Sequence, residues 1–327
     1  MKVLNLYGVN DLRLDEKDMP ICQADEVLVK VKYCGICGSD IQRVYSKGTY
    51  HFPTVIGHEF SGVVEYDSEN KLTGKKVAVF PLLPCFNCES CKKGNYASCS
   101  DYDYYGSRRD GGMAEYIAVK RWNLIVLNDF VPIEQGAMLE PVAVARHATM
   151  KLGNIQGMNI LISGAGPIGL IAAQWSKLFG AKAIYFFDID KQKIDFAKKM
   201  GFYEYNNDEI DAAIEGTGAS DALSHCLKAL KAGGKITLMG NPVKEIALAQ
   251  NDYWNILRKE LQLFGTWNSS YNDTVNDWKE GIDAITRGDI NLEPLITHKY
   301  KLEQYKEAFE LMYKRKEFYN KVMFQID

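Results

Sequence analysis

One cysteine and a histidine–glutamate pair offer three side chains that could bind a metal ion together. Cys37 lies in a glycine-flanked loop, and the adjacent residues His58 and Glu59 follow in a second loop. A thiolate, an imidazole and a carboxylate form a mixed ligand set that suits zinc. The spacing is too long for a zinc finger, so the pattern favours a site that keeps a coordination position open, as catalytic zinc requires. Because lone cysteines and histidines are more often core residues, this prediction needs support from the rest of the chain.

Four further cysteines form the most specific pattern in the sequence: Cys85, Cys88, Cys91 and Cys99. Four thiolates can close a tetrahedral zinc site with no open position and so staple a loop too polar to fold alone. An iron–sulfur cluster is the alternative. However, seven residues separate the last two cysteines and no proline follows, which departs from the bacterial ferredoxin spacing. The pattern therefore predicts a structural zinc.

A glycine-rich loop predicts a nucleotide site in the second half of the chain. The loop follows an apolar strand, opens an apolar helix, and is followed about twenty residues later by an acidic residue at the end of the next strand. The glycines allow a tight turn and close approach of a pyrophosphate, and the acidic side chain favours NAD over NADP. A glycine-rich turn in an unrelated α/β domain is the alternative. The predicted NAD-binding residues are Gly164, Gly166, Pro167, Ile168, Gly169, Asp188 and Lys193.

The patterns of apolar residues predict two kinds of architecture along the chain. Residues 1 to about 75 alternate apolar and polar positions and are expected to be all-β. From residue 158 short apolar strands alternate with helical segments, which predicts parallel strands joined by crossover helices. A helix at 302–313 and a strand at 319–325 are expected to close the chain.

Composition excludes several classes of protein. The 327 residues favour about two domains, and the net charge of −3 gives no reason to expect nucleic acid or an anionic membrane as a partner. No apolar run is long and continuous enough to span a bilayer, and the N-terminus resembles a first strand rather than a signal peptide. Without a secretory signal, metal binding explains the eight cysteines better than disulfides. We therefore expect a cytoplasmic protein.

The order of these motifs resembles that of the zinc-containing medium-chain dehydrogenases, in their polyol dehydrogenase branch. The cysteine loop, Gly57-His58-Glu59, the four-cysteine lobe, Glu140-Pro141 and the glycine loop follow one another as in that family. The resemblance implies a GroES-like β-barrel catalytic domain and a Rossmann domain with a doubly wound parallel sheet. It also implies a homodimer or homotetramer. The expected divisions are 1–145 for the catalytic domain with its zinc lobe at 81–101, 146–288 for the NAD-binding domain, and 289–327 for a segment returning to the first domain.

The resemblance also implies roles for individual residues. Cys37, His58 and Glu140 are the expected catalytic zinc ligands, with Glu59 either a ligand or a carboxylate just outside them. Ser39 resembles the hydroxyl that receives the substrate proton.

The implied activity is reversible, NAD-linked oxidation of a secondary alcohol of a polyol phosphate, of the galactitol 1-phosphate to tagatose 6-phosphate type. A phosphate needs cations, and the candidates are Arg43, Lys47, Arg108 and Arg109. The alternatives are a sorbitol-, xylitol- or butanediol-type dehydrogenase acting on an unphosphorylated polyol, a zinc-free reductase of the same fold, and a non-catalytic NAD-binding sensor.

Overall fold

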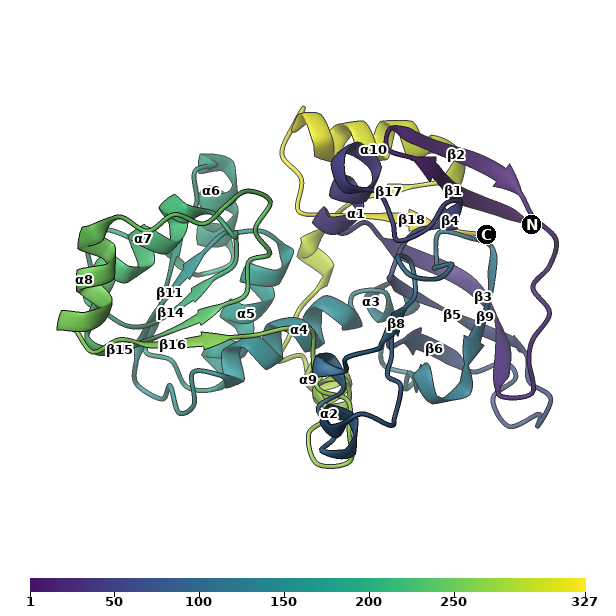
Figure 1. The fold of residues 1–327 in the computed structure, drawn as a ribbon, viewed down its shortest axis with the longest axis horizontal. Coiled ribbons are helices and arrows are strands. Elements are labelled where there is room, and N and C mark those ends of the chain that lie inside the picture. The colour runs from purple at the N-terminus through teal and green to yellow at the C-terminus, as the bar shows by residue number, and fades with distance from the viewer. The chain divides into compact units, whose positions relative to one another are not determined.

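The computed structural model describes residues 1–327 and divides them into two compact units (Figure 1). Unit 1 comprises residues 1–140, 271–286 and 291–327, and unit 2 comprises residues 141–270 and 287–290. Residues 271–286, which we expected in the NAD-binding domain, therefore lie with unit 1. The reason is aromatic packing, because the ring of the fully buried Trp278 lies 5.4 Å from that of Phe80.

Unit 1 is built mainly from antiparallel strands. Its largest sheet has the order β10-β6-β5-β3-β18-β17, with β9 also paired to β3, and a second sheet has the order β2-β1-β4. Its strands are β1 (Lys2–Gly8), β2 (Asp11–Glu16), β3 (Glu26–Gly35), β4 (Thr54–Val55), β5 (Glu59–Tyr66), β6 (Lys76–Val79), β7 (Leu82–Leu83), β8 (Asp103–Tyr104), β9 (Tyr116–Lys120), β10 (Leu124–Val126), β17 (Ile296–Tyr300) and β18 (Lys321–Gln325). One continuous core lies among these strands and includes Val29, Phe60 and Phe324.

The helices of unit 1 are short, apart from two near the C-terminal end of the chain. Besides short 3-10 helical turns, they are α1 (Gly38–Gln42), a π-helical turn (Arg43–Lys47), α2 (Glu89–Lys92), α3 (Ile133–Gly136), α9 (Asp277–Arg287) and α10 (Tyr305–Lys314). The expectation that residues 1–75 are all-β is wrong at α1 and the π-helical turn. The helix starts there because Asp40 accepts a hydrogen bond from the backbone N–H of Cys37 at 2.9 Å, which caps the first turn.

The C-terminal segment completes the largest sheet of unit 1. β18 pairs antiparallel with β3, with Phe324 opposite Cys34 and Met323 opposite Gly35. β17 lies parallel to β18, and α10 connects the two strands (Figure 1). The chain end therefore lies beside the strand that leads directly into the Cys37 loop.

Unit 2 is a six-stranded parallel sheet in the order β13-β12-β11-β14-β15-β16. This order is that of the doubly wound dinucleotide-binding fold. The strands are β11 (Asn159–Ser163), β12 (Ala183–Phe187), β13 (Tyr203–Glu204), β14 (Ile210–Glu215), β15 (Leu230–Leu238) and β16 (Gln262–Gly265). The helices are α4 (Leu139–Met150), whose first two residues belong to unit 1, α5 (Pro167–Leu178), α6 (Lys191–Lys199), α7 (Ser220–Ala229) and α8 (Gln250–Arg258).

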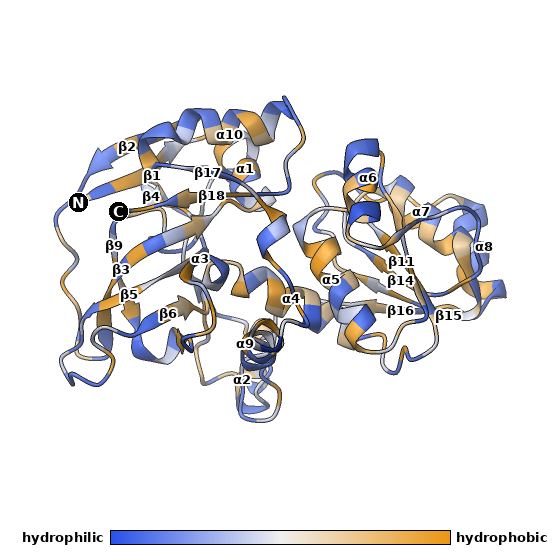
Figure 2. Ribbon diagram, turned by 180° about the vertical axis from the view of Figure 1, so that it is seen from behind, coloured by the Kyte–Doolittle hydropathy of each residue, from blue (hydrophilic) through white to orange (hydrophobic).

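Helices cover both faces of the parallel sheet. Right-handed crossovers place α5 and α6 on one face and α7 and α8 on the other, and Figure 1 shows the sheet between α5 and the pair α7 and α8. Figure 2 shows α5 as a largely hydrophobic helix, which agrees with its row of buried residues from Gly169 to Ser176. The predicted strand–helix alternation is confirmed. None of the helices is both long and apolar enough to cross a membrane.

The predicted glycine loop connects β11 to α5. Gly164 has a φ of 101°, a conformation that favours glycine. A Cβ atom on Gly169 would overlap the carbonyl oxygen of Gly164, whereas a Cβ atom on Gly166 would meet no atom within 4 Å. Gly169 is therefore needed for packing within the protein, and Gly166 leaves open space beside the loop.

This difference predicts different effects of two alanine substitutions on stability. Gly169→Ala is expected to lower the free energy of unfolding by about 1–3 kcal/mol, because the added methyl group overlaps backbone. Gly166→Ala, the matched control, is expected to change it by less than about 0.5 kcal/mol. Chemical denaturation of the two variants measures this, and equal stabilities would contradict the assignment.

Candidate active site

The structure brings the three predicted metal-binding side chains Cys37, His58 and Glu59 together. Their ligand atoms all lie within 4.8 Å of one another. Cys37 is the N-cap of α1, His58 lies just before β5, and Glu59 is the first residue of β5. His58 and Glu59 are buried, and Cys37 is partly exposed. A metal ion bound by two buried side chains and one partly exposed thiol could still be reached by a small molecule.

Asp40 connects the Cys37 loop to His58. Its fully buried carboxylate lies 3.5 Å from Nδ1 of His58 and accepts the backbone N–H of Cys37. Burial alone would raise the pKa of Asp40, but the imidazole of His58 and the guanidinium of Arg43 outweigh it, and the pKa lies below its ordinary value. The carboxylate therefore stays ionised and can orient the imidazole, a contact that metal-binding histidines usually make with a carboxylate.

Ser39 lies on α1 between Cys37 and Asp40, and Arg43 fixes its hydroxyl group. The guanidinium of Arg43 donates to Oγ of Ser39 at 2.7 Å and lies 3.2 Å from Oδ1 of Asp40. Because arginine only donates, the hydroxyl proton of Ser39 is directed toward another acceptor. Arg43, a predicted phosphate contact, is thus already engaged by two neighbours.

Glu140 is the second residue of α4 and is buried near the same group. The 4.8 Å group of ligand atoms comprises Cys37, His58 and Glu59 and does not include Glu140. Burial, together with the charge of Glu59, raises the pKa of Glu140 to about 7, although His58 and Lys321 act in the opposite direction. A buried carboxylate with a raised pKa gains most from a nearby cation. The hydroxyl of Tyr104 donates to its Oε1 at 3.4 Å.

Sequence reasoning missed two residues at this site, Tyr104 and Lys321. Lys321 is the first residue of β18 and its side chain is only 2% exposed. It forms an ion pair with Glu59 and also donates to the carbonyl oxygen of Ile36 at 3.3 Å. The one signal in the sequence was a lysine at the start of an apolar strand, since a buried lysine requires a carboxylate partner. For Tyr104 no spacing signal was present, because it reaches Glu140 only through the fold.

The four cysteines of the predicted lobe also converge. Their sulfur atoms all lie within 4.8 Å of one another, and none forms a disulfide. Backbone N–H groups lower the pKa of Cys88 to about 6, whereas burial raises that of Cys91 to about 12. The sulfurs of Cys85 and Cys91 are 3.9 Å apart. That separation suits two thiolates each about 2.3 Å from one tetrahedral zinc ion.

Aromatic side chains attach this lobe to the rest of unit 1. The ring of Trp122 lies 5.0 Å from that of Phe86, 5.4 Å from that of Tyr96 and 5.1 Å from that of Tyr271. Asn272 also donates to the carbonyl oxygen of Gly94 at 3.0 Å. Apart from its four cysteines, the lobe is therefore held by edge-to-face ring contacts and by this hydrogen bond.

In unit 2, Asp188 lies at the end of β12 beside the glycine loop. One of its oxygens accepts the backbone N–H of Ala165 at 2.8 Å, and the other accepts that of Asp190 at 2.9 Å. These bonds fix the carboxylate in place while each oxygen keeps a free lone pair. Lys193 lies in the first turn of α6.

A buried carboxylate that the sequence analysis did not consider, Glu215, orders the loop after β14. Its Oε1 accepts the backbone N–H of Thr217 at 2.7 Å and the hydroxyl of Thr217 at 2.5 Å, and Gly218 also donates to it. A Cβ atom on Gly164 would lie 3.0 Å from a methyl carbon of Thr217. The two loops at this edge of the sheet are thus packed together.

The four predicted phosphate contacts differ in their surroundings. Arg109 is paired with Asp103 at 2.8 Å, and Lys47 is exposed at the end of the π-helical turn. Arg108 lies between two tyrosine rings, 4.0 Å from the centre of Tyr50 and 4.5 Å from that of Tyr102. Its ring contacts hold the guanidinium flat without neutralising it.

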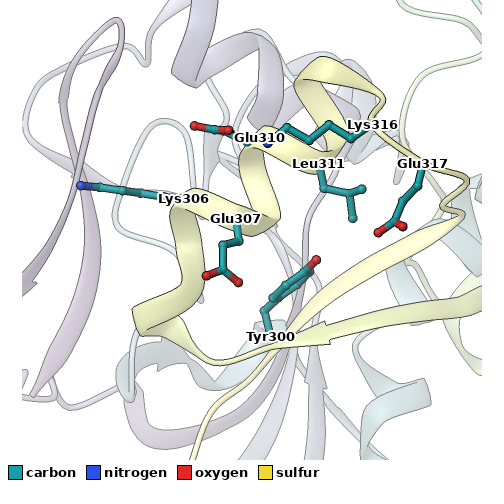
Figure 3. Close-up of a pocket in the computed structure, with 7 residues that line it drawn as sticks. All are labelled: Tyr300, Lys306, Glu307, Glu310, Leu311, Lys316 and Glu317. Atoms are coloured by element: carbon teal, nitrogen blue, oxygen red, sulfur yellow. Dashed lines mark hydrogen bonds and ion pairs between the residues drawn. The ribbon is translucent and has the colours of Figure 1, made fainter.

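A surface pocket of about 270 Å³ lies between α10 and β17, away from these residues (Figure 3). Its lining carries three glutamates and two lysines, and the side chains of Tyr300 and Leu311 close its apolar wall. None of the predicted metal, coenzyme or phosphate residues lines it.

Comparison with known proteins assigns the chain to a family. Residues 23–129 match the alcohol dehydrogenase GroES-like domain, and residues 167–287 match the zinc-binding dehydrogenase domain. The chain belongs to the zinc-binding dehydrogenases. The predicted resemblance and fold class are therefore confirmed, with a GroES-like unit 1 and a Rossmann-type unit 2.

Individual relatives of this zinc-binding dehydrogenase act on several alcohols. The chain is 36% identical to galactitol 1-phosphate 5-dehydrogenase of Escherichia coli K12, over 92% of this chain and 94% of the relative. It is 30% identical to sorbitol dehydrogenase of Bacillus subtilis, over 95% and 93% of the two chains. The crystal structure of Escherichia coli galactitol-1-phosphate dehydrogenase superposes with a TM-score of 0.92, at 34% identity, over 99% of this chain and 100% of that one. These relatives identify an alcohol or polyol dehydrogenase and leave its substrate to be tested.

The two groups of candidate zinc ligands predict separable losses of metal. Cys37→Ser is expected to lower the zinc content from about two ions per chain to about one while leaving the fold intact. Cys91→Ser is expected to lose the other ion and to lower Tm by about 5–10 °C, because the polar lobe then lacks the metal ion that holds it together. Elemental analysis and thermal unfolding of the same samples measure both effects.

Cys22→Ser is the matched control, since Cys22 lies outside both groups of ligands. It should keep both zinc ions and the Tm of the unmodified protein. A Cys91→Ser protein with full zinc content and unchanged Tm would show that the lobe does not hold a structural metal.

Proposed function

We propose that this protein catalyses the reversible NAD-linked oxidation of a secondary alcohol of a polyol phosphate to the corresponding ketone. The observation that carries the proposal is the convergence of Cys37, His58 and Glu59, with Glu140 nearby, in a zinc-binding dehydrogenase. The relative named galactitol 1-phosphate 5-dehydrogenase supports a substrate of this class. All eight cysteines are unpaired, which supports a reducing, cytoplasmic location.

We propose that the metal site is formed by Cys37, His58 and a buried carboxylate, which is either Glu59, whose oxygen lies within 4.8 Å of their ligand atoms, or the nearby Glu140. Zinc at this position supplies Lewis-acid polarisation of the alcohol. Ser39 accepts the hydroxyl proton of the substrate while its own proton passes onward. The guanidinium of Arg43, 2.7 Å from Oγ, stabilises negative charge on that hydroxyl as the proton leaves.

NAD would be held by the loop from Gly164 to Gly169 and by Asp188, and it supplies the acceptor for the hydride. The open space beside Gly166 and the free N–H groups at the start of α5 suit a pyrophosphate. Asp188 is fixed by two backbone N–H groups, so its remaining lone pairs can accept both hydroxyls of the adenosine ribose. A ribose 2′-phosphate would be repelled by this carboxylate, which favours NAD over NADP.

Among the four predicted cations, Arg108 is the one we assign to the phosphate. Arg43 and Arg109 already contact Asp40 and Asp103, and Lys47 is held by no neighbour that would orient it. Arg108 instead has two aromatic neighbours and no carboxylate within ion-pair distance. Its Nε is also buried without a hydrogen-bond partner. The ring of Tyr102 lies 6.3 Å from that of Tyr104, which in turn contacts Glu140, so Arg108 lies on a path of side chains leading to the metal site.

Substitution of Arg108 tests the substrate class. Arg108→Met is expected to lower kcat/KM for galactitol 1-phosphate by about 10- to 100-fold, since a charge-assisted hydrogen bond contributes about 1.5–3 kcal/mol. Activity on galactitol or sorbitol should change by less than about twofold. Steady-state formation of NADH measures both rates.

Arg109→Met is the matched control, because Arg109 is the neighbouring arginine and is already paired with Asp103. It should leave the preference between phosphorylated and free polyols unchanged. If the unmodified enzyme prefers sorbitol or butanediol to galactitol 1-phosphate, the second candidate, a dehydrogenase of unphosphorylated polyols, replaces the first. Tight binding of NADH without turnover of any polyol would instead support a sensor.

A homodimer, or a tetramer built from it, is the assembly we propose from unit 2. β16 is one of the two edge strands of the parallel sheet, and Leu263 on it is exposed. The neighbouring helix α8 also exposes three large apolar side chains: Tyr253, Trp254 and Leu257. A free edge beside an apolar patch is a surface that a second copy can cover by strand pairing about a twofold axis.

Leu257→Glu is expected to shift the protein from dimer to monomer, because it places a charge in the apolar patch. Leu178→Glu on α5 is the control, since α5 packs on β11 and β12 rather than beside β16. Analytical ultracentrifugation over a range of concentrations measures the mass. A Leu257→Glu protein that stays dimeric at all concentrations would locate the interface elsewhere.

A further inference from the structure

The segment that leaves the four-cysteine lobe contacts both ends of the proposed substrate site. It starts after Cys99, the last cysteine of the lobe. Tyr102 packs against the guanidinium of Arg108, and the ring of Tyr104, two residues further on, lies beside the imidazole of His58. Because side chains alternate along an extended segment, Tyr102 and Tyr104 project to the same side of it.

The two tyrosines form a continuous series of side chains between Arg108 and His58. The centre of the Tyr102 ring lies 4.5 Å from the guanidinium carbon of Arg108 and 6.3 Å from the centre of the Tyr104 ring, which it meets at an interplanar angle of 76°. The Tyr104 ring lies 5.8 Å from the ring of His58. Edge-to-face contacts favour one relative orientation of the rings, so the series has a defined length.

Backbone hydrogen bonds hold the same residues in place. The N–H group of Arg108 donates to the carbonyl oxygen of Tyr104 at 3.0 Å and closes the turn between them. Tyr104 belongs to β8, which pairs antiparallel with β7. Just before Tyr102, the sulfur of Cys99 accepts the backbone N–H of Asp101 at 3.4 Å. Arg108 is therefore tied to Tyr104 both through the main chain and through the ring of Tyr102.

Tyr50, the other tyrosine against Arg108, is held differently. Its ring lies 4.0 Å from the guanidinium carbon, but the residue is 67% exposed. It lies in the segment between the π-helical turn and β4, and its backbone N–H donates to the carbonyl oxygen of Ser107 at 3.4 Å. Tyr50 therefore covers the guanidinium from the solvent side, whereas Tyr102 also connects it to the group of metal-binding side chains.

A fixed separation between a cation and a metal site would select substrates by length. A polyol phosphate has one anionic end, and each of its secondary alcohols lies at a different distance from that end. When the phosphate contacts Arg108, the separation determines which alcohol reaches Cys37 and His58. A mobile cation would follow the phosphate and admit several alcohols, and a displacement of about 1 Å at a reacting centre can cost about 100-fold in rate.

We propose that Tyr102 is a positioning residue that fixes the distance from Arg108 to the metal-binding group, and that this distance selects polyol phosphates by the position of the alcohol along the chain. This inference rests on the proposed function, in which Arg108 binds the substrate phosphate. It gives the segment that leaves the four-cysteine lobe a part in substrate selection.

Tyr102→Leu tests this because it removes the ring and leaves the charge of Arg108 in place. The ratio of kcat/KM between hexitol and pentitol phosphates is expected to move about 10- to 100-fold toward one, since the guanidinium can then follow either phosphate. Turnover of galactitol should change by less than about twofold. Steady-state formation of NADH measures these rates. Calorimetric titration of the enzyme–NADH complex, which cannot oxidise an alcohol, should show that the variant also discriminates less in affinity.

Three further variants make the test specific. Tyr102→Phe keeps the ring and should keep the ratio of the unmodified enzyme within about twofold. Tyr50→Leu is the matched control, because it removes the tyrosine on the other side of the same guanidinium, and it should weaken binding of all polyol phosphates alike. If Tyr102→Leu fails to fold, Tyr102→Trp retains aromatic packing, and its larger ring should displace Arg108 and change the preferred length.

Several results would overturn the positioning role of Tyr102. One is an unchanged ratio in Tyr102→Leu or, where that variant does not fold, in Tyr102→Trp. Another is a loss of discrimination in Tyr102→Phe, and a third is an equal loss in Tyr50→Leu.

The proposed function and this inference fail in different ways. Equal turnover of galactitol and galactitol 1-phosphate by the unmodified enzyme would contradict both, because the phosphate would then contribute nothing. A preference for phosphorylated polyols without discrimination by length would overturn the inference alone. Discrimination that Tyr102→Leu retains would do the same and leave the proposed function standing.

Discussion

The ion pair between Lys321 and Glu59 links the metal site to the topology of unit 1. Two opposite charges removed from water must remain in contact, because either one alone would be costly to bury. This requirement fixes β18 against β3, and it fixes Glu59 at the start of β5. The same neighbourhood holds three further buried ionisable groups, Asp40, His58 and Glu140. Together with Lys321 and Glu59, these make five buried ionisable groups, and they are stable together only when positive and negative charges balance. The ion pair balances two of the charges, and a bound cation would balance the remaining negative charge.

The group around Cys37 and the four-cysteine lobe both offer zinc ligands, but they differ in donor atoms and in how closed they are. At Cys37, glycine and a short helix leave the thiol partly exposed, and the carboxylates around it can take different partners. In the lobe, four sulfurs lie within 4.8 Å of one another and backbone N–H groups approach them, so no position is left for another ligand. Ring contacts from Trp122 then attach the lobe to unit 1. An open set of mixed ligands suits chemistry, and a closed set of thiolates suits structure.

Unit 2 depends on close backbone approach rather than on buried charge. Because Gly169 has no side chain, its backbone can lie directly against the carbonyl oxygen of Gly164. In the same way, the backbone of Gly240 packs against that of Thr217 and Gly218. Glu215 and Asp188 each accept several hydrogen bonds, chiefly from backbone N–H groups, at the carboxyl ends of β14 and β12, the two strands that flank β11. The loops at this edge are thereby ordered by contacts within the protein. Such ordering lowers the entropy that binding would otherwise cost.

The sequence alone determined the features that depend on short-range spacing. The four cysteines of the lobe, the glycine loop with Asp188, and the alternation of strands and helices in unit 2 all act over short stretches of chain, so residue types and intervals were sufficient to predict them. Only the tertiary structure decided which distant side chains meet. Lys321 reaches Glu59 across the chain through strand pairing, Tyr104 reaches Glu140 through the fold, and Trp278 moves residues 271–286 into unit 1. The physical reason is that long-range partners are selected by burial and by the matching of charge, and neither quantity exists until the chain has folded.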